Sequence, residues 1–355
     1  MKSNDATNFS WKINTGIEAQ ELQSTIINYD NNSGETGAIQ ADNSLHAEQV
    51  FYFAQLTSNI TNRLSGELSA SINFNQYKYI RSLPVALNSF TRNLEPQLMP
   101  RAGISYSILP SLVWRIIASK GYSPPTIAEI LPSDNLINTN LQPEQGWNYE
   151  TGFRFRDNKD VIWFDVAAFT YSLQDAIVRR VHPDDTEFFI NAGGTLQNGF
   201  ESQITIQLLK KEKGFIRNLK ISNAFTYSDL TFSDYVNDET DYSGNKLTGI
   251  PQQVVVTSLA ARFTSGFYIT VAHNYTSAIP LNDVNTVDAD AYHLVQGKIG
   301  WMSSFKKTTI ELFAGADNLL DEKYSLGNDL NAVGGRYFNA APLRSFFGGV
   351  NVFLR

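Results

Sequence analysis

Long stretches in which apolar and polar residues alternate are the feature of this sequence that most restricts its fold. In residues 64–75 every second residue is Leu, Gly, Ala, Ile or Phe, and those between are Ser, Glu or Asn. The same period of two recurs in residues 147–156 and 200–208. It places successive side chains on opposite faces of a β-strand. Stretches of about ten residues exceed the usual five or six of a globular strand and match a tilted strand that crosses a bilayer.

About fourteen segments carry this pattern, and none of them shows helical periodicity. They are residues 10–22, 46–58, 64–77, 97–108, 111–121, 143–156, 160–173, 196–209, 217–229, 252–264, 266–277, 291–303, 306–318 and 343–354. Short polar turns are expected at residues 60–63, 109–110, 157–159, 210–214, 265–266 and 303–305. Long loops rich in Asn, Asp, Gly, Ser and Tyr are expected at residues 23–45, 78–96, 122–142, 174–195, 230–251, 278–290 and 319–342.

The short turns and the long loops alternate strictly along the chain. Short turns on one side and long loops on the other are typical of an outer-membrane barrel. We therefore predict an all-β fold, a transmembrane antiparallel up-and-down β-barrel with about fourteen strands present. The short turns and the end of the chain at Arg355 are expected on the periplasmic side, with the long loops facing outward. Closing the wall would remove strand edges that lipid cannot satisfy.

Composition agrees with this prediction without establishing it. The mean hydropathy is -0.23, and no stretch approaches the roughly 18 apolar residues of a membrane-spanning helix. A barrel wall alternates lipid-facing and lumen-facing side chains, so its average resembles that of a soluble protein. The 23 Phe, 16 Tyr and 5 Trp suit strands and interfacial girdles. The absence of cysteine excludes disulfides, and the net charge of -7 argues against nucleic acid as a partner.

The first residues of the sequence bear on the cellular location. Residues 1–16 contain no apolar run of the kind that a signal peptide needs. A protein bound for the outer membrane must carry such a signal, so we expect the export signal to lie upstream of this chain. A cytosolic protein is the competing interpretation.

Four sequence motifs resemble those of the TonB-dependent outer-membrane receptor family. They are "RAGISYSILPSLVWRIIASKGYSPPTIAEI" at 101–130, "NLQPEQGWNYETGFRF" at 140–155, "NAGGTLQNGFESQI" at 191–204 and "AGADNLLDEKY" at 314–324, followed by the closing "GGRYFNAAPLRSFFGGVNVFLR". The second motif carries the family's L-x-P-E and Y-E-x-G patterns through Leu141, Pro143, Glu144, Tyr149, Glu150 and Gly152. The motifs occur in family order and lie on the predicted strands.

The resemblance implies a function and a set of partners. Such receptors have a 22-stranded barrel filled by an amino-terminal plug, and the plug carries the segment that the TonB-type energy-transducing complex grasps. Residues 1–355 would then be a partial barrel domain, the last fourteen strands, without the plug and the first strands. The implied location is the outer membrane of a Gram-negative bacterium, in contact with lipid and lipopolysaccharide. The implied ligand is a ferric siderophore or another chelate, and haem and cobalamin receptors share the same motifs.

Catalytic, cofactor and metal sites are not expected. The histidines His46, His182, His273 and His293 lie in different segments, and none has the i, i+2 or i, i+4 spacing of a metal site. The acidic stretches at 182–187 and 235–244 lack the ligand spacing of a calcium-binding loop, and we interpret them as solvated loop carboxylates. No nucleophile, phosphate-binding or zinc-protease motif is present.

Ligand-binding candidates come from the outer ends of the predicted strands and from the loops. Aromatic rings supply stacking area, and arginine supplies planar charge-assisted hydrogen bonds. The candidates are Tyr77, Tyr79, Arg81, Arg92, Tyr122, Arg179, Arg180, Tyr324, Arg336 and Tyr337. An interfacial girdle and lipopolysaccharide-facing charge are the alternative roles.

Charged residues are also expected on the inward faces of the predicted strands. They are Arg101, Arg115, Glu150, Arg154, Asp165, Glu201 and Glu311. In the family such residues contact the plug or line the lumen. Ion pairing between neighbouring strands is the alternative role.

Three hypotheses on function follow, and an enzyme is the weakest further one. The leading hypothesis is a receptor and transporter for TonB-dependent uptake of a ferric siderophore or similar metal chelate. A plug-less fourteen-stranded passive diffusion channel is the first alternative. A soluble all-β binding module is the second.

Overall fold

The computed structural model describes residues 9–83, 87–132, 138, 140–182, 186–191, 193–237 and 240–354. Fourteen antiparallel strands follow one another in chain order through a single sheet, which confirms the predicted number and order. They are β1 (Ser10–Asn32), β2 (Glu35–Asn59), β3 (Leu64–Leu83), β5 (Gln97–Leu109), β6 (Leu112–Ser123), β7 (Glu144–Arg156), β8 (Ile162–Gln174), β11 (Gly194–Lys210), β12 (Ile216–Asp234), β15 (Gln253–Phe263), β16 (Phe267–Thr276), β19 (Tyr292–Phe305), β20 (Thr308–Asp317) and β21 (Ser345–Leu354).

The remaining elements are short and lie in the connections between these strands. β4 (Leu87–Asn93) pairs with the outer part of β3. Three small hairpins are β9 (Ile177–Val181) with β10 (Glu187–Asn191), β13 (Val236–Asn237) with β14 (Thr240–Asp241), and β17 (Ile279–Pro280) with β18 (Asp288–Ala289). A one-turn helix α1 (Ile127–Ile130) and a 3-10 turn η1 (Val333–Gly335) complete the set. None of the described helices is long and apolar enough to span a membrane.

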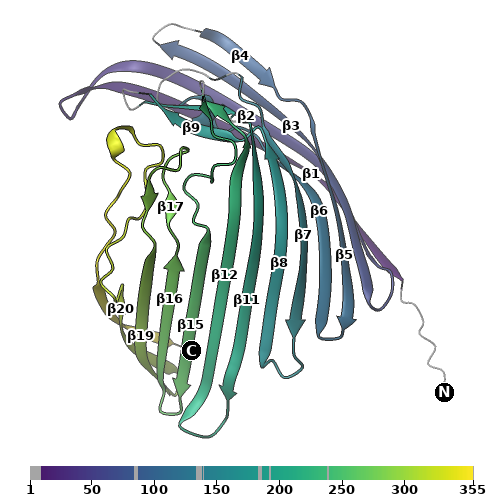
Figure 1. The fold of residues 1–355 in the computed structure, drawn as a ribbon, viewed down its shortest axis with the longest axis vertical. Helices are drawn as coiled ribbons and strands as arrows, with labels where there is room; N and C mark the ends of the chain where they lie inside the picture. Colours follow the sequence, from purple (N-terminus) through teal and green to yellow (C-terminus); the bar gives the residue numbers. More distant parts are fainter. Residues whose placement is uncertain are drawn as a thin grey trace.

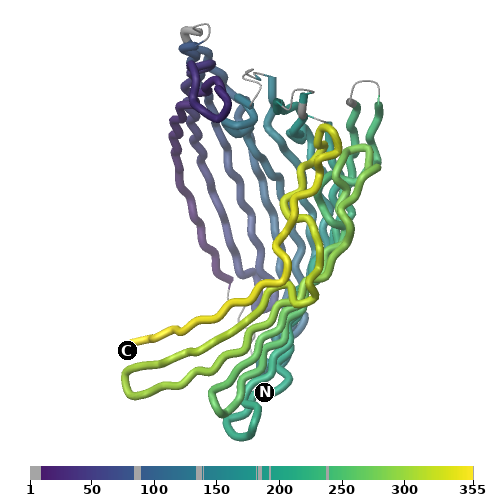
Figure 2. Tube along the Cα trace, turned by 90° about the vertical axis from the view of Figure 1, so that its left-hand side faces the viewer, coloured from purple at the N-terminus to yellow at the C-terminus, as the bar shows by residue number. Residues whose placement is uncertain are grey.

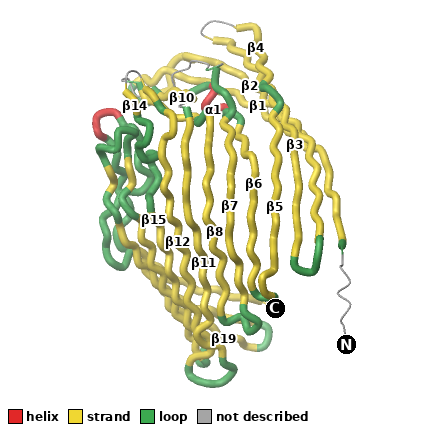
Figure 3. Tube along the Cα trace, turned by 45° about the vertical axis from the view of Figure 1, so that its right-hand side comes forward, coloured by secondary structure: helices red, strands yellow, loops and turns green. Residues whose placement is uncertain are grey.

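The connections separate into two ends of the sheet, as the sequence predicted. Two residues join β5 to β6, and similarly short turns join β7 to β8, β11 to β12, β15 to β16 and β19 to β20. We call this end the short-turn end. The hairpins, α1 and η1 lie at the opposite end, the long-loop end, where Figure 1 and Figure 3 show most of the irregular chain.

The prediction of a long loop at residues 23–45 is wrong. β1 and β2 continue to Asn32 and Glu35, so only Ser33 and Gly34 form the turn. Both turn residues have positive φ, as a tight hairpin turn requires, and the Asn31 side chain accepts a hydrogen bond from the Gly34 amide. The polar composition of this stretch reflects a hairpin that extends beyond the rest of the sheet.

The two faces of the sheet differ as the alternation predicts. Strand pairing places Leu68, Ile104, Phe153 and Ile299 on one face, and each of these side chains is at least 40% exposed. The seven charged residues expected on inward faces lie together on the other face. An exposed apolar surface on so many strands fits contact with lipid and is costly in water.

The sheet is strongly curved, and its two end strands lie apart. Figure 2 shows the last strands bending away from the direction of the first ones. Among the described residues, β1 pairs with β2 alone and β21 pairs with β20 alone. Both terminal strands therefore present an edge. The sheet has the polar and apolar faces of a barrel wall.

Candidate functional site

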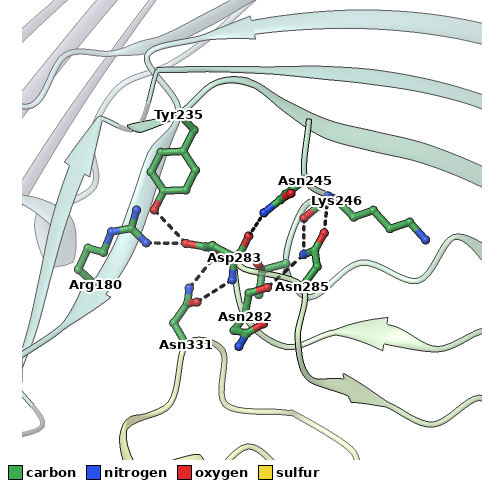
Figure 4. A network of polar contacts seen from close by, with 9 residues as sticks. Arg180, Tyr235, Asn245, Lys246, Asn282, Asp283, Asn285 and Asn331 are labelled. Carbon is green, nitrogen blue, oxygen red and sulfur yellow. Dashed lines mark hydrogen bonds and ion pairs between the residues drawn. The ribbon is translucent and has the colours of Figure 1, made fainter. Parts of the chain in front are cut away.

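A buried carboxylate holds the long loops together at the long-loop end (Figure 4). Asp283 Oδ2 accepts hydrogen bonds from Arg180 Nη1 at 2.5 Å and from the Tyr235 hydroxyl at 2.9 Å. Its Oδ1 accepts from Thr248 Oγ1 at 2.5 Å and from Asn331 Nδ2 at 3.1 Å. Asp283 is 4% exposed and Arg180 8%, so the ion pair lies in a low-dielectric environment. We call these five residues the Asp283 hub.

The Asp283 hub joins four different connections. Arg180 lies on β9 between β8 and β11, and Tyr235 and Thr248 lie between β12 and β15. Asp283 follows β17 between β16 and β19, and Asn331 lies between β20 and β21. The Arg180 guanidinium also lies 4.7 Å from the centre of the Tyr235 ring, a cation–π contact. Four connections are thus fixed to one another at a single carboxylate.

The predicted candidates on β3 are packing residues at the opposite side of this end. Tyr77 is 8% exposed, donates a hydrogen bond to the Pro125 carbonyl at 2.6 Å and packs on Leu94 and Ile130. Tyr79 is 2% exposed and donates to Asn43 Oδ1 at 2.5 Å. These bonds leave little of either ring for a ligand.

Three other candidates surround the two buried tyrosines. Arg81 Nε donates to the Tyr79 hydroxyl at 3.1 Å, and the Tyr122 hydroxyl accepts from Asn75 Nδ2 at 2.7 Å. Arg92 lies on β4 opposite Tyr77, where burial lowers the pKa of its guanidinium. All three side chains are partly exposed, so each can still meet a ligand at this end.

The remaining candidates lie in two further connections. Arg179 is 40% exposed and forms an ion pair with Glu187 across the β9–β10 hairpin. In the connection before β21, Tyr324 packs on Tyr292 with ring centres 4.8 Å apart, and the Tyr337 ring lies 6.4 Å from that of Phe338. Arg336 is exposed, and its Nε donates to the Val333 carbonyl. These four side chains are accessible at the long-loop end.

The charged residues of the polar face form ion pairs between neighbouring strands. Arg115 contacts Asp165 at 2.6 Å and Glu150 at 3.3 Å, and Arg154 contacts the second oxygen of Asp165 at 2.6 Å. Glu201, Arg115 and Asp165 line one depression on the polar face. This group spans β6, β7, β8 and β11.

Two more members of the predicted polar face pair in the same way. Arg101 contacts Glu67 at 3.3 Å on the neighbouring strand. Glu311 is 8% exposed and accepts hydrogen bonds from Lys298 at 3.1 Å, from Asn351 at 2.9 Å and from the Tyr268 hydroxyl. The alternative role, pairing across strands, is therefore present in the structure, and contact with a plug stays a prediction.

Residues of the recognised motifs anchor the loops rather than face a ligand. Asn191 accepts from the Gln142 amide at 2.7 Å and donates to the carbonyls of Gln142 and Asp175. The Glu144 side chain accepts from the Ile177 amide at 2.7 Å, and Leu141 is 1% exposed. Asn318 exchanges two hydrogen bonds with the backbone of Glu322.

Sequence spacing missed two groupings. Asp283 is 103 residues from Arg180 in the sequence. No sequence motif identified Asp283 or Tyr235 as a candidate. His273 and His293, which lie in different predicted segments, meet across β16 and β19. In the described part of the chain, no group of three or more His, Cys, Asp and Glu residues could hold a metal ion. Asp184 and Asp185 of the first acidic stretch, and residues 238–239 of the second, lie outside the described residues.

Comparisons with known proteins agree with this architecture. Residues 2–319 match the family model described as TonB dependent receptor-like, beta-barrel. The chain therefore belongs to the TonB-dependent receptor family, through its β-barrel domain.

Solved structures with the same fold are receptors and transporters. The siderophore receptor PiuA from Acinetobacter baumannii superposes with a TM-score of 0.76 at 15% identity, over 99% of this chain and 54% of that one. The ferric citrate transporter FecA gives 0.79 at 14% identity, over 97% and 52%. The copper transporter OprC gives 0.72 at 15% identity, over 97% and 54%. The chain thus spans about half the length of these proteins, and identities this low show the fold alone.

Proposed function

We propose that this chain is the ligand-capturing part of an outer-membrane receptor barrel that takes up a ferric siderophore or a similar metal chelate. The family match over residues 2–319 is the observation that carries the proposal. Three of the proteins that share the fold are named as a siderophore receptor, a ferric citrate transporter and a copper transporter. The proposed location is the outer membrane of a Gram-negative bacterium, with the long-loop end facing outward and lipid and lipopolysaccharide around the apolar face.

The accessible candidates at the long-loop end have the chemistry that such a ligand needs. Ferric chelates are bulky and often anionic, so they favour aromatic stacking and bidentate hydrogen bonds from arginine. The proposed ligand residues are Arg81, Arg92, Tyr122, Arg179, Tyr324, Arg336 and Tyr337, all at least partly exposed at this end. Tyr77, Tyr79 and Arg180 are proposed to support them, because their side chains are buried.

Release of the ligand inward needs an energy supply. We propose that it comes from a TonB-type complex acting through a plug domain outside this barrel domain. The binding step alone is assigned to this chain. Linkage between ligand binding outside and plug movement inside would then be a coupling free energy between two sites.

Binding of a panel of chelates tests the proposal. The chain, folded in detergent micelles, is titrated with ferric citrate, a ferric catecholate and a ferric hydroxamate while tryptophan fluorescence is followed. We expect saturable binding of one class. Arg179→Gln and Arg336→Gln should each weaken it by about tenfold or more, since a hydrogen bond to a charged group contributes roughly 1.5–3 kcal/mol.

Arg156→Gln is the matched control at the short-turn end, where Arg156 is 69% exposed and pairs with Asp160. It should leave affinity unchanged. Heat-modifiable gel mobility shows that each variant is folded. Folded protein that binds no chelate and gives steady conductance in a planar bilayer would contradict the proposal and favour the passive channel.

A further inference from the structure

Two of the four histidines meet on the apolar face of the sheet. His273 comes from β16 and His293 from the neighbouring strand β19. The distance from His273 Nε2 to His293 Nδ1 is 2.9 Å, and the two rings are nearly parallel, with centres 5.2 Å apart. The Tyr275 ring lies 4.7 Å from that of His293. Two imidazole nitrogens from neighbouring strands thus lie within hydrogen-bond distance of each other.

The position of this pair separates it from the proposed chelate site. Strand pairing places both histidines on the face that carries the exposed side chains of Ile269, Val271 and Ile299. His273 lies three residues before the end of β16 and His293 is the second residue of β19, both at the long-loop end. The pair therefore lies at the outer margin of the apolar face, and any ligand reaches it from outside the wall.

The distance between the nitrogens matches a chelated metal ion. Neutral imidazole binds a transition metal at about 2.0–2.1 Å, so two nitrogens 2.9 Å apart give an angle of about 90° at the metal. That angle suits the square-planar or tetragonal geometry of Cu²⁺ and Ni²⁺ better than the tetrahedral geometry of Zn²⁺. We propose that His273 and His293 form a two-histidine site for a divalent transition metal, with Cu²⁺ preferred over Ni²⁺ as the general order of stability requires.

Other ligands must complete the coordination. No third His, Cys, Asp or Glu side chain joins the pair within the described ranges. The remaining positions are open to water because His293 is exposed and His273 partly so. Metal binding requires the lone pairs of His273 Nε2 and His293 Nδ1, so it replaces the hydrogen bond that the two rings otherwise share.

Calorimetric titration of the folded chain tests this site. The protein, in detergent micelles and stripped of metal with EDTA, is titrated with Cu²⁺ and separately with Ni²⁺. We expect one Cu²⁺ per chain and weaker Ni²⁺. His273→Ala and His293→Ala should each lower Cu²⁺ affinity by about tenfold or more, because one imidazole cannot chelate. Low-temperature electron paramagnetic resonance should show two nitrogen ligands, reduced to one or none in the variants.

Three controls make the test specific. His46→Ala and His182→Ala remove histidines from other parts of the chain and should leave Cu²⁺ affinity unchanged. Tyr275→Phe keeps the aromatic ring and removes the hydroxyl, so unchanged affinity would show that nitrogen holds the metal. All variants should keep heat-modifiable gel mobility. Folded protein without saturable Cu²⁺ binding, or binding that survives both histidine variants, would overturn the proposal.

Discussion

At the scale of single residues, buried polar groups decide how the long-loop end is built. Asp283, Arg180 and Tyr235 are each less than 10% exposed, and the carboxylate accepts four side-chain hydrogen bonds. A buried charge is tolerated only when it is paired and hydrogen-bonded. The Asp283 hub therefore fixes the relative positions of four connections more firmly than their sequences suggest.

Asp283→Asn should loosen these connections. The substitution keeps the shape of the side chain but removes the charge opposite Arg180, and breaking one partner of a buried ion pair costs about 3–5 kcal/mol. We expect faster amide hydrogen exchange and earlier proteolysis in residues 230–251 and 319–342. Asp288→Asn, at an exposed aspartate of the same connection, is the matched control. Equal protection in both variants would contradict a clamping role for Asp283.

At the scale of elements, the glycines and asparagines of the motifs have structural explanations. Gly152 lies opposite Arg115, and a Cβ atom added there would come 2.4 Å from the Val166 carbonyl of the next strand. The glycine thus leaves room for the β8 backbone, and two residues further along β7 Arg154 pairs with Asp165 of β8. In the loops, the three hydrogen bonds of Asn191 connect β10 to Gln142 and Asp175.

Gly152→Ala should destabilise the sheet by about 1–3 kcal/mol, the usual range for an overpacked site. The reason is that the contacted atom is backbone, which cannot rotate away. Gly103→Ala is a matched control on the same face, because its Cβ would meet nothing closer than 3.8 Å. Urea unfolding followed by heat-modifiable gel mobility measures both. Similar midpoints for the two variants would rule out the close approach as the cause.

Asn191→Ala should separate the connection before β7 from the β9–β10 hairpin. The change leaves the Gln142 amide and the Asp175 carbonyl without their partner, at a cost of about 1–3 kcal/mol. Hydrogen exchange should rise at residues 140–144 and 175–177. Asn140→Ala, at an exposed position of the same connection, should leave exchange unchanged. Faster exchange in Asn140→Ala but not in Asn191→Ala would show that Asn191 does not hold the connection to the hairpin.

At the scale of the whole molecule, the main consequence of the architecture is that each of the two end strands has one unpaired edge. β1 and β21 are 23 and 10 residues long, and each has one partner in the described sheet. An unpaired strand edge carries backbone donors and acceptors that lipid cannot satisfy. The curved wall therefore has two sites at which further strands can add.

The 355-residue chain should self-associate in detergent through these edges. Size-exclusion chromatography with light scattering should give a mass of two or more chains. Proline substitutions at alternate positions of β21, which remove backbone donors, should shift the mass toward one chain. A monodisperse single chain with full amide protection in β1 and β21 would show instead that the two edges meet.

The sequence by itself determined the fold class, the fourteen strands and the side on which each strand is polar. These properties depend on which side chains alternate along a strand, so the period of two in the sequence predicts them directly. The family motifs were visible too, although their structural roles were not. Some connections were misjudged. The hairpin of β1 and β2 replaces the loop predicted at 23–45, because its polar residues resemble a loop, and β3 and β4 occupy much of the loop predicted at 78–96. The turn predicted at 303–305 lies two to three residues later, between β19 and β20.

The tertiary structure alone decided how the long-loop end is assembled. The Asp283 hub joins residues about one hundred positions apart, and His273 meets His293 only because β16 and β19 pair in one register. Such contacts depend on where the connections fold back over the sheet, and local composition does not specify that. Burial of Tyr77 and Tyr79 was hidden for the same reason, since their partners come from α1 and from β2.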